Sequence, residues 1–305
     1  MRRPPPLQNF LHFPVTGGLC LLAVAVSVAN WYGHVDVSSL EMSYWTWHGQ
    51  PWRLLSCALF HANPVHLLFD VYWTWVFGAI VEEAFGSVFM LGLVVALQAG
   101  SAAGEYAVAI GGVGLSGVGY GLFGFLWALG RYDRRFAEVI DRNTAWMFVG
   151  WFFLCIILTF TNTAPIANMA HAAGAVLGGL AGLMVAFRGG RRYTAGAGLG
   201  AAIAVLLTCS MPAIRPLVNF SKYGGNEEFQ LGYDALKADQ NVAAARFLEQ
   251  AVAYRYTDQA YWFDLGIAYE KLGDSARAAE SFRRAAAMQP GAKDADDAIK
   301  SGKNS

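Results

Sequence analysis

Residues 111–124 read GGVGLSGVGYGLFG, and they open an apolar segment that runs to about Gly130. A segment of this length and composition can cross a lipid bilayer as a helix. Ser116 places a hydroxyl group between Gly114 and Gly117, near the start of the segment. A serine in a membrane helix can bond to the carbonyl one turn earlier and needs no other partner. The chemical role of Ser116 therefore depends on what the rest of the chain brings to it.

The composition of the whole chain is typical of an integral membrane protein. Of its 305 residues, 55% are apolar and 14% are charged, the formal net charge is zero, and the mean hydropathy is positive. This profile argues against a soluble enzyme, and we expect no nucleic-acid partner because the chain has no basic excess. The four cysteines include no CxxC pair, so neither a disulfide framework nor a zinc site is indicated.

Seven apolar segments have about the 20 residues that a helix needs to cross hydrocarbon. They cover residues 14–31, 61–81, 87–104, 114–130, 144–162, 167–187 and 196–214. Small residues at 27–29 would also suit cleavage of a signal peptide. We favour a retained first span, because six further segments follow it. The sequence thus predicts an all-α protein, a polytopic membrane helix bundle with seven spans.

Arginine residues decide the predicted orientation. Those at positions 2–3, 131–142 and 188–192 fall on one side of the predicted spans, and the positive-inside rule makes that side cytoplasmic. The N-terminus is then cytoplasmic, and an odd number of spans puts the C-terminal region outside. The loop 32–60 is rich in tryptophan and tyrosine, which favours a position at the membrane surface. A short basic N-terminus without an evident transit peptide favours a bacterial plasma membrane.

A repeat of about 34 residues runs through residues 226–290 and resembles the tetratricopeptide repeat (TPR), a helix-turn-helix unit. An unrelated amphipathic helical hairpin is the alternative. Two copies are fewer than usual, so we expect a small domain that leans on a neighbour or a partner. The predicted organisation is a cytoplasmic N-terminal segment at 1–13, a six-span core at 14–188, a seventh span and linker at 189–221, a TPR-like domain at 222–290 and a disordered tail at 291–305.

Polar residues in the predicted spans gather at one depth. Ionisable groups in a membrane are costly, so each is a candidate functional residue. His61, His66 and Asp70 lie in the second span, Ser116 in the fourth and His171 in the sixth. These even-numbered spans share one direction, and each carries its polar group near its start. The pattern predicts one cavity close to the outer face.

Glycine spacing suggests that two of these groups meet. Gly174 and Gly178 follow His171, and glycines 117, 121 and 124 follow Ser116, at intervals that let two helices approach closely. Close approach would put an imidazole beside the Ser116 hydroxyl, which is how a serine becomes a nucleophile. A purely structural glycine contact is the alternative.

With these motifs in order, residues 14–188 resemble the rhomboid family of intramembrane serine proteases. The matching positions are Trp52-Arg53, His61, His66, Gly114-Leu115-Ser116-Gly117, and Ala170-His171 with Gly174 and Gly178. The resemblance implies cleavage of transmembrane segments of membrane proteins, at sites where small or helix-breaking residues destabilise the helix. The proposed chemistry requires no cofactor. His61, His66 and Asp70 could chelate a metal ion in principle, but they do not form a convincing ligand set, so we expect no metal.

The resemblance also implies roles for single residues. Ser116 would be the nucleophile and His171 the general base and acid, without a third acidic group. Tyr120 would stack on His171, and His66 and the Ser116 backbone amide would stabilise the oxyanion. The resemblance gives His61 a part in shaping the cavity. Trp52 and Arg53 would belong to the interfacial loop, with Arg53 bracing it.

Asp70 departs from the family pattern, which has an asparagine donor there. An ionised carboxylate only accepts hydrogen bonds and would repel a developing negative charge. A neutral Asp70 could still donate, whereas pairing with His66 or His171 would impair catalysis. We expect weakened turnover; the alternatives are an inactive rhomboid relative that binds membrane-protein clients and a proton-coupled transporter. The TPR-like domain would bind a peptide or protein partner, and the spans would contact the lipid bilayer.

Overall fold

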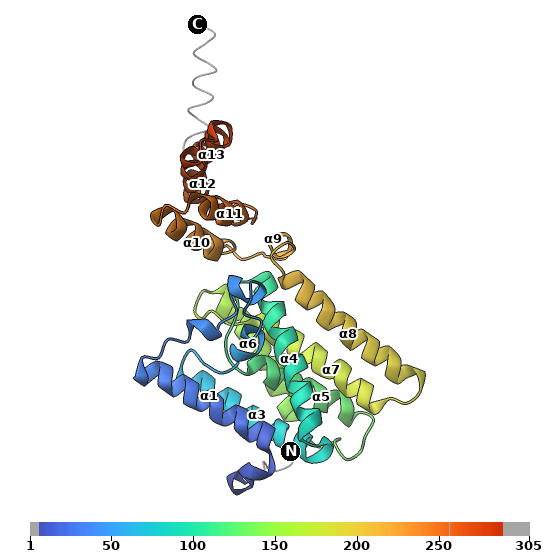
Figure 1. Cartoon of the computed structure of the whole chain (residues 1–305). Coiled ribbons are helices and arrows are strands. Elements are labelled where there is room, and N and C mark those ends of the chain that lie inside the picture. Colours follow the sequence, from blue (N-terminus) through green and yellow to red (C-terminus); the bar gives the residue numbers. More distant parts are fainter. Residues whose placement is uncertain (1–5, 256, 289–305) are drawn as a thin grey trace. The chain divides into compact units, whose positions relative to one another are not determined.

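The computed structural model describes residues 6–255 and 257–288, and within these residues it contains helices and no strand (Figure 1). The predicted all-α class is confirmed for this part of the chain. The chain divides into two compact units, with the boundary between Met211 and Pro212. The predicted tail at 291–305, Pro290, and the arginines at positions 2 and 3 lie outside the described residues.

Six helices among the described residues are long and apolar enough to cross a bilayer. They are α1 (Pro14–Gly33), α3 (Pro64–Phe85), α4 (Ser87–Val108), α6 (Arg142–Phe160), α7 (Asn168–Ala186) and α8 (Gly190–Ser210). The remaining predicted span forms α5 (Ser116–Gly130), which has 15 residues and is shorter than the length that crosses hydrocarbon. The expected seven full-length spans are therefore not all present.

Two glycines explain why α5 begins late. Gly111 has a φ of 105° and Gly114 a φ of 103°, a region far from the helical value of about −63° that residues with a side chain rarely adopt. The chain before Ser116 therefore forms a loop, and the predicted span at 114–130 loses its first residues. The result is that Ser116 is the first residue of a helix.

The predicted seventh span at 196–214 is also displaced. Helix α8 begins at Gly190 and ends at Ser210, so Arg191 and Arg192 lie in its first turn and not in a connection. Arginine side chains at a helix end can reach the polar interface while their helix continues into the apolar layer. Helix α8 therefore includes Arg191 and Arg192, which the predicted topology placed in a loop.

Helix α5 lies at the centre of the first unit, beside α3, α4 and α7 (Figure 1). Most of its residues from Gly117 to Leu126 are buried. Its contact with α7 runs along both helices, because Gly174 packs on the carbonyl of Gly117 and Gly178 on that of Gly121. A methyl group at either α7 position would collide with the α5 backbone. The predicted close approach of these two segments is present.

The loop between α1 and α3 contains three short helices, η2 (Ser38–Leu40), η3 (Tyr44–Trp47) and α2 (Arg53–Ser56), and a further short helix, η1 (Leu7–His12), precedes α1. Arg53 is buried, and its Nη1 atom donates to the backbone oxygens of Ser38 at 2.6 Å and Glu41 at 2.8 Å. Its Nε atom donates to Gln50 at 2.6 Å. Arg53 thus ties three parts of the loop together, whereas Trp52 is half exposed.

The second unit consists of α9 (Arg215–Val218) and the helices of two hairpins, α10 (Asn226–Lys237) with α11 (Asn241–Ala251) and α12 (Gln259–Lys271) with α13 (Ser275–Ala287). A Cβ atom on Gly232 would lie 2.6 Å from the Leu248 side chain, and one on Gly266 would lie 2.5 Å from that of Phe282. The second pair stands 34 residues after the first, so the same close contact recurs at the predicted repeat distance.

The second unit begins at Pro212 and not at residue 222 as predicted. The buried Arg215 donates to the hydroxyl of Tyr254 at 2.7 Å and lies 3.2 Å from Glu228. Tyr254 in turn donates to Glu228 at 2.8 Å, and burial raises the pKa of Tyr254, which keeps it a donor. The predicted linker is therefore part of the helical unit that follows it.

Candidate active site

Ser116 occupies the N-terminal end of α5 and is half-buried. The first amide groups of a helix have no partner within the helix, and the helix dipole makes this end favourable for negative charge. The preceding loop is fixed by two backbone donors: Gly114 N–H donates to the oxygen of Cys57 at 2.9 Å, and Leu115 N–H donates to His61 Nε2 at 3.2 Å. The hydroxyl of Ser116 thus lies beside the first amide groups of α5, which can donate hydrogen bonds to an anion.

His171 lies near the start of α7 and is buried. Its ring stacks on that of Tyr120, with centroids 4.6 Å apart and an interplanar angle of 21°. The Tyr120 hydroxyl donates to the backbone oxygen of Phe148 at 3.1 Å, which fixes the tyrosine ring. Nδ1 of His171 is buried and has no hydrogen-bond partner among the described residues. The imidazole is therefore held by ring stacking and not by an acidic side chain.

The α5–α7 contact brings Ser116 and His171 to the same end of two helices. Gly117 directly follows Ser116, and Gly174 lies one turn after His171; these two glycines touch. Because Gly121 then meets Gly178, the two helices run in the same direction. Tyr120, one turn after Ser116, reaches His171 across this contact.

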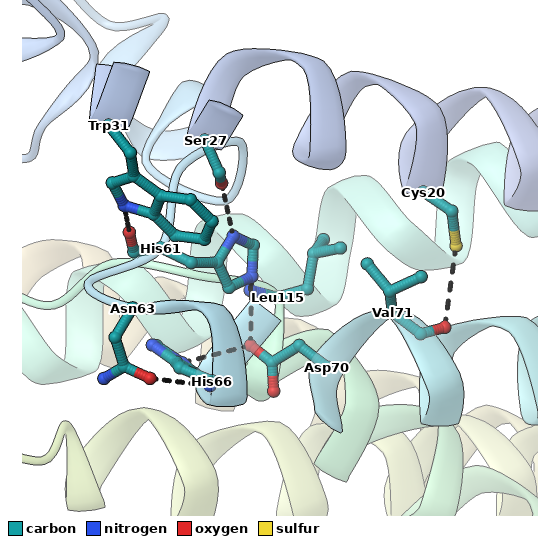
Figure 2. A network of polar contacts seen from close by, with 9 residues as sticks. All are labelled: Cys20, Ser27, Trp31, His61, Asn63, His66, Asp70, Val71 and Leu115. Carbon is teal, nitrogen blue, oxygen red and sulfur yellow. Dashed lines mark hydrogen bonds and ion pairs between the residues drawn. The ribbon is translucent and has the colours of Figure 1, made fainter. Parts of the chain in front are cut away.

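The residues His61, His66 and Asp70, here called the polar cluster, lie next to this end of α5. Figure 2 shows their side chains pointing toward one another. Asp70 Oδ2 is 3.2 Å from His61 Nε2 and 3.2 Å from His66 Nε2. Gly114 closes the cluster, because a Cβ atom there would lie 2.9 Å from His66 and 3.0 Å from Asp70.

The prediction that His61 lies inside the second span is wrong, since His61 lies in the loop before α3. Asn63 caps the helix by accepting from the His66 N–H at 3.0 Å, and the helix begins at Pro64. His61 is nevertheless fully buried, and its Nδ1 atom lies 3.2 Å from Ser27 Oγ on α1. His61 therefore connects α1 to the loop that leads into Ser116.

Protonation within the polar cluster follows from these contacts. To accept the Leu115 N–H, Nε2 of His61 must carry no proton, so it cannot also donate to Asp70. In agreement, Asp70 Oδ2 is buried and has no hydrogen-bond partner among the described residues, although two imidazole nitrogens lie at 3.2 Å. Each of the two contacts is an ion pair when its histidine is protonated. The same three side chains offer ligand atoms that lie within 4.8 Å of one another, a spacing that a metal ion can bridge.

A small cavity beside Ser116 contains residues that sequence reasoning missed. Its lining includes Ser116, Gly117, Ala170, Gln98, Ser101 and Glu105. The buried Glu105 accepts the Ala170 N–H at 3.0 Å and so caps the start of α7, one residue before His171. The predicted third span ended at residue 104, which left Glu105 outside it; as the single acidic residue of the apolar stretch 87–108, it could have been found.

Comparison with known proteins shows what the part of the chain that holds this site resembles. Residues 48–188 match the Rhomboid domain. The predicted likeness at 14–188 is thus confirmed from residue 48 onward, and the match does not include α1 or the second unit. The match to the Rhomboid domain and the six long apolar helices among the described residues support an integral membrane protein.

Two bacterial proteins are similar to this chain over part of its length. The rhomboid protease GlpG of Klebsiella pneumoniae subsp. pneumoniae is 31% identical to this chain over 189 residues, which is 57% of this chain and 62% of the relative. The rhomboid protease GlpG of Klebsiella pneumoniae strain 342 matches with the same identity and coverage. The chain thus spans about three fifths of the length of these relatives.

Proposed function

We propose that this protein is an intramembrane serine protease that cleaves transmembrane segments of membrane proteins. The observation that carries the proposal is the stacking of His171 on Tyr120, across a helix contact that begins one residue after Ser116. The Rhomboid domain and the similarity to two bacterial rhomboid proteases support the same reaction class.

In the proposed reaction His171 takes the proton of the Ser116 hydroxyl while the oxygen attacks the scissile carbonyl. The tetrahedral intermediate collapses as His171 returns the proton to the leaving amine, which leaves an acyl group on Ser116. Water then attacks the ester with His171 again as the base, and the acid product leaves. Stacking on Tyr120 orients the imidazole, so the dyad needs no third acidic group.

The oxyanion of that intermediate would form at the N-terminal end of α5, where backbone donors and the helix dipole favour negative charge. The Ser116 amide and His66 are the proposed donors. Asp70 lies 3.2 Å from His66, and an ionised carboxylate there would oppose the developing charge. We therefore propose a protease with reduced turnover, whose rate increases when Asp70 becomes an asparagine.

The substrates we propose are membrane-protein segments that contain small or helix-breaking residues, because a helix must unwind before its carbonyl can reach Ser116. The proposed orientation has a cytoplasmic N-terminus, a site that opens toward the outer face of a bacterial plasma membrane, and the second unit outside. Water would enter from that face, since polar groups in a membrane need access to water or to each other.

We propose that the second unit is a TPR-like domain that binds a peptide or protein partner and recruits substrates. Its support is the close glycine contact that recurs after 34 residues. Removal of residues 212–305 cuts the chain at the boundary between the two units. We expect this deletion to lower the cleavage of recruited substrates and to leave the cleavage of a short reporter unchanged. Equal cleavage of every substrate by both forms would remove this role.

The main test uses purified protein in liposomes with a reporter that contains a cleavable transmembrane segment. Native protein should release the product, Ser116→Ala should release none, and Asp70→Asn should release it faster. Equal product from native protein and Ser116→Ala would exclude the hydrolase. The buried, acceptor-only Asp70 favours one second candidate, an inactive client-binding protein, which predicts that neither native protein nor Asp70→Asn cleaves but that both retain the reporter.

A further inference from the structure

The polar cluster presents a set of donor atoms that the proposed reaction does not use fully. His61, His66 and Asp70 each offer one ligand atom, and these atoms lie within 4.8 Å of one another. Asp70 Oδ2 lies 3.2 Å from Nε2 of each histidine. Two imidazoles and a carboxylate are a common ligand set for Zn²⁺. The two measured separations are close to the edge of a tetrahedron with metal–ligand bonds near 2.1 Å, which is about 3.4 Å.

The orientation of these atoms also fits a shared ion. Asp70 is 4% exposed, and its Oδ2 atom has no hydrogen-bond partner among the described residues despite its two close nitrogens. Buried carboxylate oxygens normally receive a donor or coordinate a metal. Atoms at ligand spacing that satisfy one another incompletely can instead bind one shared ion. Figure 2 shows the three side chains gathered together, with a dashed line from Asp70 to each histidine.

The surroundings of the cluster resemble the outer shell of a three-ligand site. Nδ1 of His61 lies 3.2 Å from Ser27 Oγ, so a proton on Nδ1 can be donated to the serine while the lone pair of Nε2, which accepts the Leu115 N–H in this structure, becomes the ligand. His61 and Asp70 are buried, whereas the His66 side chain is 29% exposed. An ion could enter on the His66 side and keep water as its fourth ligand.

We propose that His61, His66 and Asp70 bind one divalent ion of the Zn²⁺ type, and that this ion inhibits proteolysis. The site itself is independent of the proposed function, but the inhibition rests on it. Asp70 is the decisive ligand, because an asparagine there would supply neither the negative charge nor as strong an oxygen donor.

Inhibition follows from the atoms that the ion would occupy. His66 is a proposed oxyanion donor, and an imidazole whose Nε2 binds a metal cannot donate from that atom. The Leu115 N–H lies 3.2 Å from His61 Nε2, so the ion competes with this amide for the same lone pair. Binding would therefore release the loop before Ser116 as well as remove a donor from the oxyanion site.

The binding test uses Co²⁺ alone as a spectroscopic substitute, with the full chain in detergent or nanodiscs. Native protein should bind one Co²⁺ and show the visible absorption bands of a four-coordinate ion. Asp70→Asn and His66→Gln should weaken binding by about tenfold or more. Asp36→Asn, which changes an exposed aspartate in the loop after α1, is the matched control and should bind like native protein. Absence of the bands from native protein, or equal bands in Asp70→Asn, would overturn the site.

The inhibition test adds Zn²⁺ to the liposome cleavage assay. Native protein should lose activity at Zn²⁺ concentrations about ten times lower than those that affect Asp70→Asn. Equal inhibition of both proteins would show that the ion acts elsewhere. Ser116→Ala separates the two proposals, because it should bind Co²⁺ like native protein while cleaving nothing. If native protein cleaves no substrate, the proposed function fails and the Co²⁺ result still decides the metal site.

Discussion

The two sides of α5 hold the candidate site in opposite ways. Toward α7, the contact is made by backbone against backbone, because glycines at 174 and 178 leave no side chain between the helices. Toward α3, the Ser116 end of α5 faces the polar cluster, whose hydrogen-bonding capacity is incompletely satisfied. The contact with α7 therefore fixes the positions of Ser116 and His171, and the polar cluster determines the charge beside Ser116. Substitutions on the first side should destroy the site, and substitutions on the second should tune it.

The largest effect is expected on the side that faces α7. In Gly178→Ala, the added methyl group would collide with the carbonyl of Gly121, which cannot rotate away. Overpacking of this kind costs about 1–3 kcal/mol, and a shift of about 1 Å in a catalytic group can cost 10²-fold in rate. We expect a lower melting temperature and a loss of cleavage of about 10²-fold. The matched control is Gly179→Ala on the same helix, where a Cβ atom meets nothing within 4 Å. Equal behaviour of the two variants would contradict a position-fixing contact.

On the side that faces α3, Asp70→Asn should raise activity. The asparagine amide would replace an acceptor with a donor near the proposed oxyanion, and loss of one such donor typically costs about 10²–10³ in rate. Because His66 and the Ser116 amide would already contribute, we expect a gain of about tenfold in kcat/KM. The exposed Asp36→Asn serves as the control. A decrease, with the fold intact, would mean that the carboxylate itself assists the reaction.

Tyr120 tests whether stacking alone orients His171. Tyr120→Phe keeps the ring but loses the bond to the oxygen of Phe148, whereas Tyr120→Leu removes the ring. An aromatic contact contributes about 0.5–1.5 kcal/mol beyond its buried area, so Tyr120→Leu should lower kcat by about 3- to 10-fold. Tyr120→Phe should stay closer to native protein. If the phenylalanine variant is the more damaged one, the hydroxyl and not the stacking orients the base.

The smallest effect is expected at the outer edge of the polar cluster. Ser27→Ala removes the contact between Ser27 Oγ and His61 Nδ1 at 3.2 Å. Loss of one such hydrogen bond should lower the free energy of unfolding by about 1 kcal/mol, measured as a small decrease in melting temperature. Cleavage should change little, because His61 keeps its contact with Leu115. A complete loss of cleavage by a folded variant would assign His61 a direct role in the reaction.

The sequence predicts the side of α5 that faces α7 better than the side that faces α3. Glycine spacing is a local signal, and it predicted the close approach of the two helices that the structure has at Gly117 and Gly174. The late start of α5 depends on the positive φ of Gly111 and Gly114, which an apolar run does not reveal. Depth in the membrane grouped His61 with Asp70, but it could not show that His61 precedes its helix or that Asp70 Oδ2 lacks a donor.

The other features that the sequence did not predict depend on contacts between residues that are distant in the chain. Arg215 reads as a charge in a linker, and only its contacts with Glu228 and Tyr254 reveal that it is a buried part of the second unit. Glu105 reads as the end of a span, and only its bond to the Ala170 N–H connects it to the helix of His171. Both side chains act through segments that are distant in sequence, which a reading of spacing cannot find.

The most direct test of the proposed dyad is labelling by a fluorophosphonate, which reacts with an activated serine. Native protein in liposomes should be labelled at a single peptide that contains Ser116, as identified by mass spectrometry. Ser116→Ala should not be labelled, and His171→Ala should be labelled far more slowly because its serine has no base. Labelling of native protein that equals that of Ser116→Ala, in a preparation with native melting behaviour, would contradict the central claim that His171 activates Ser116.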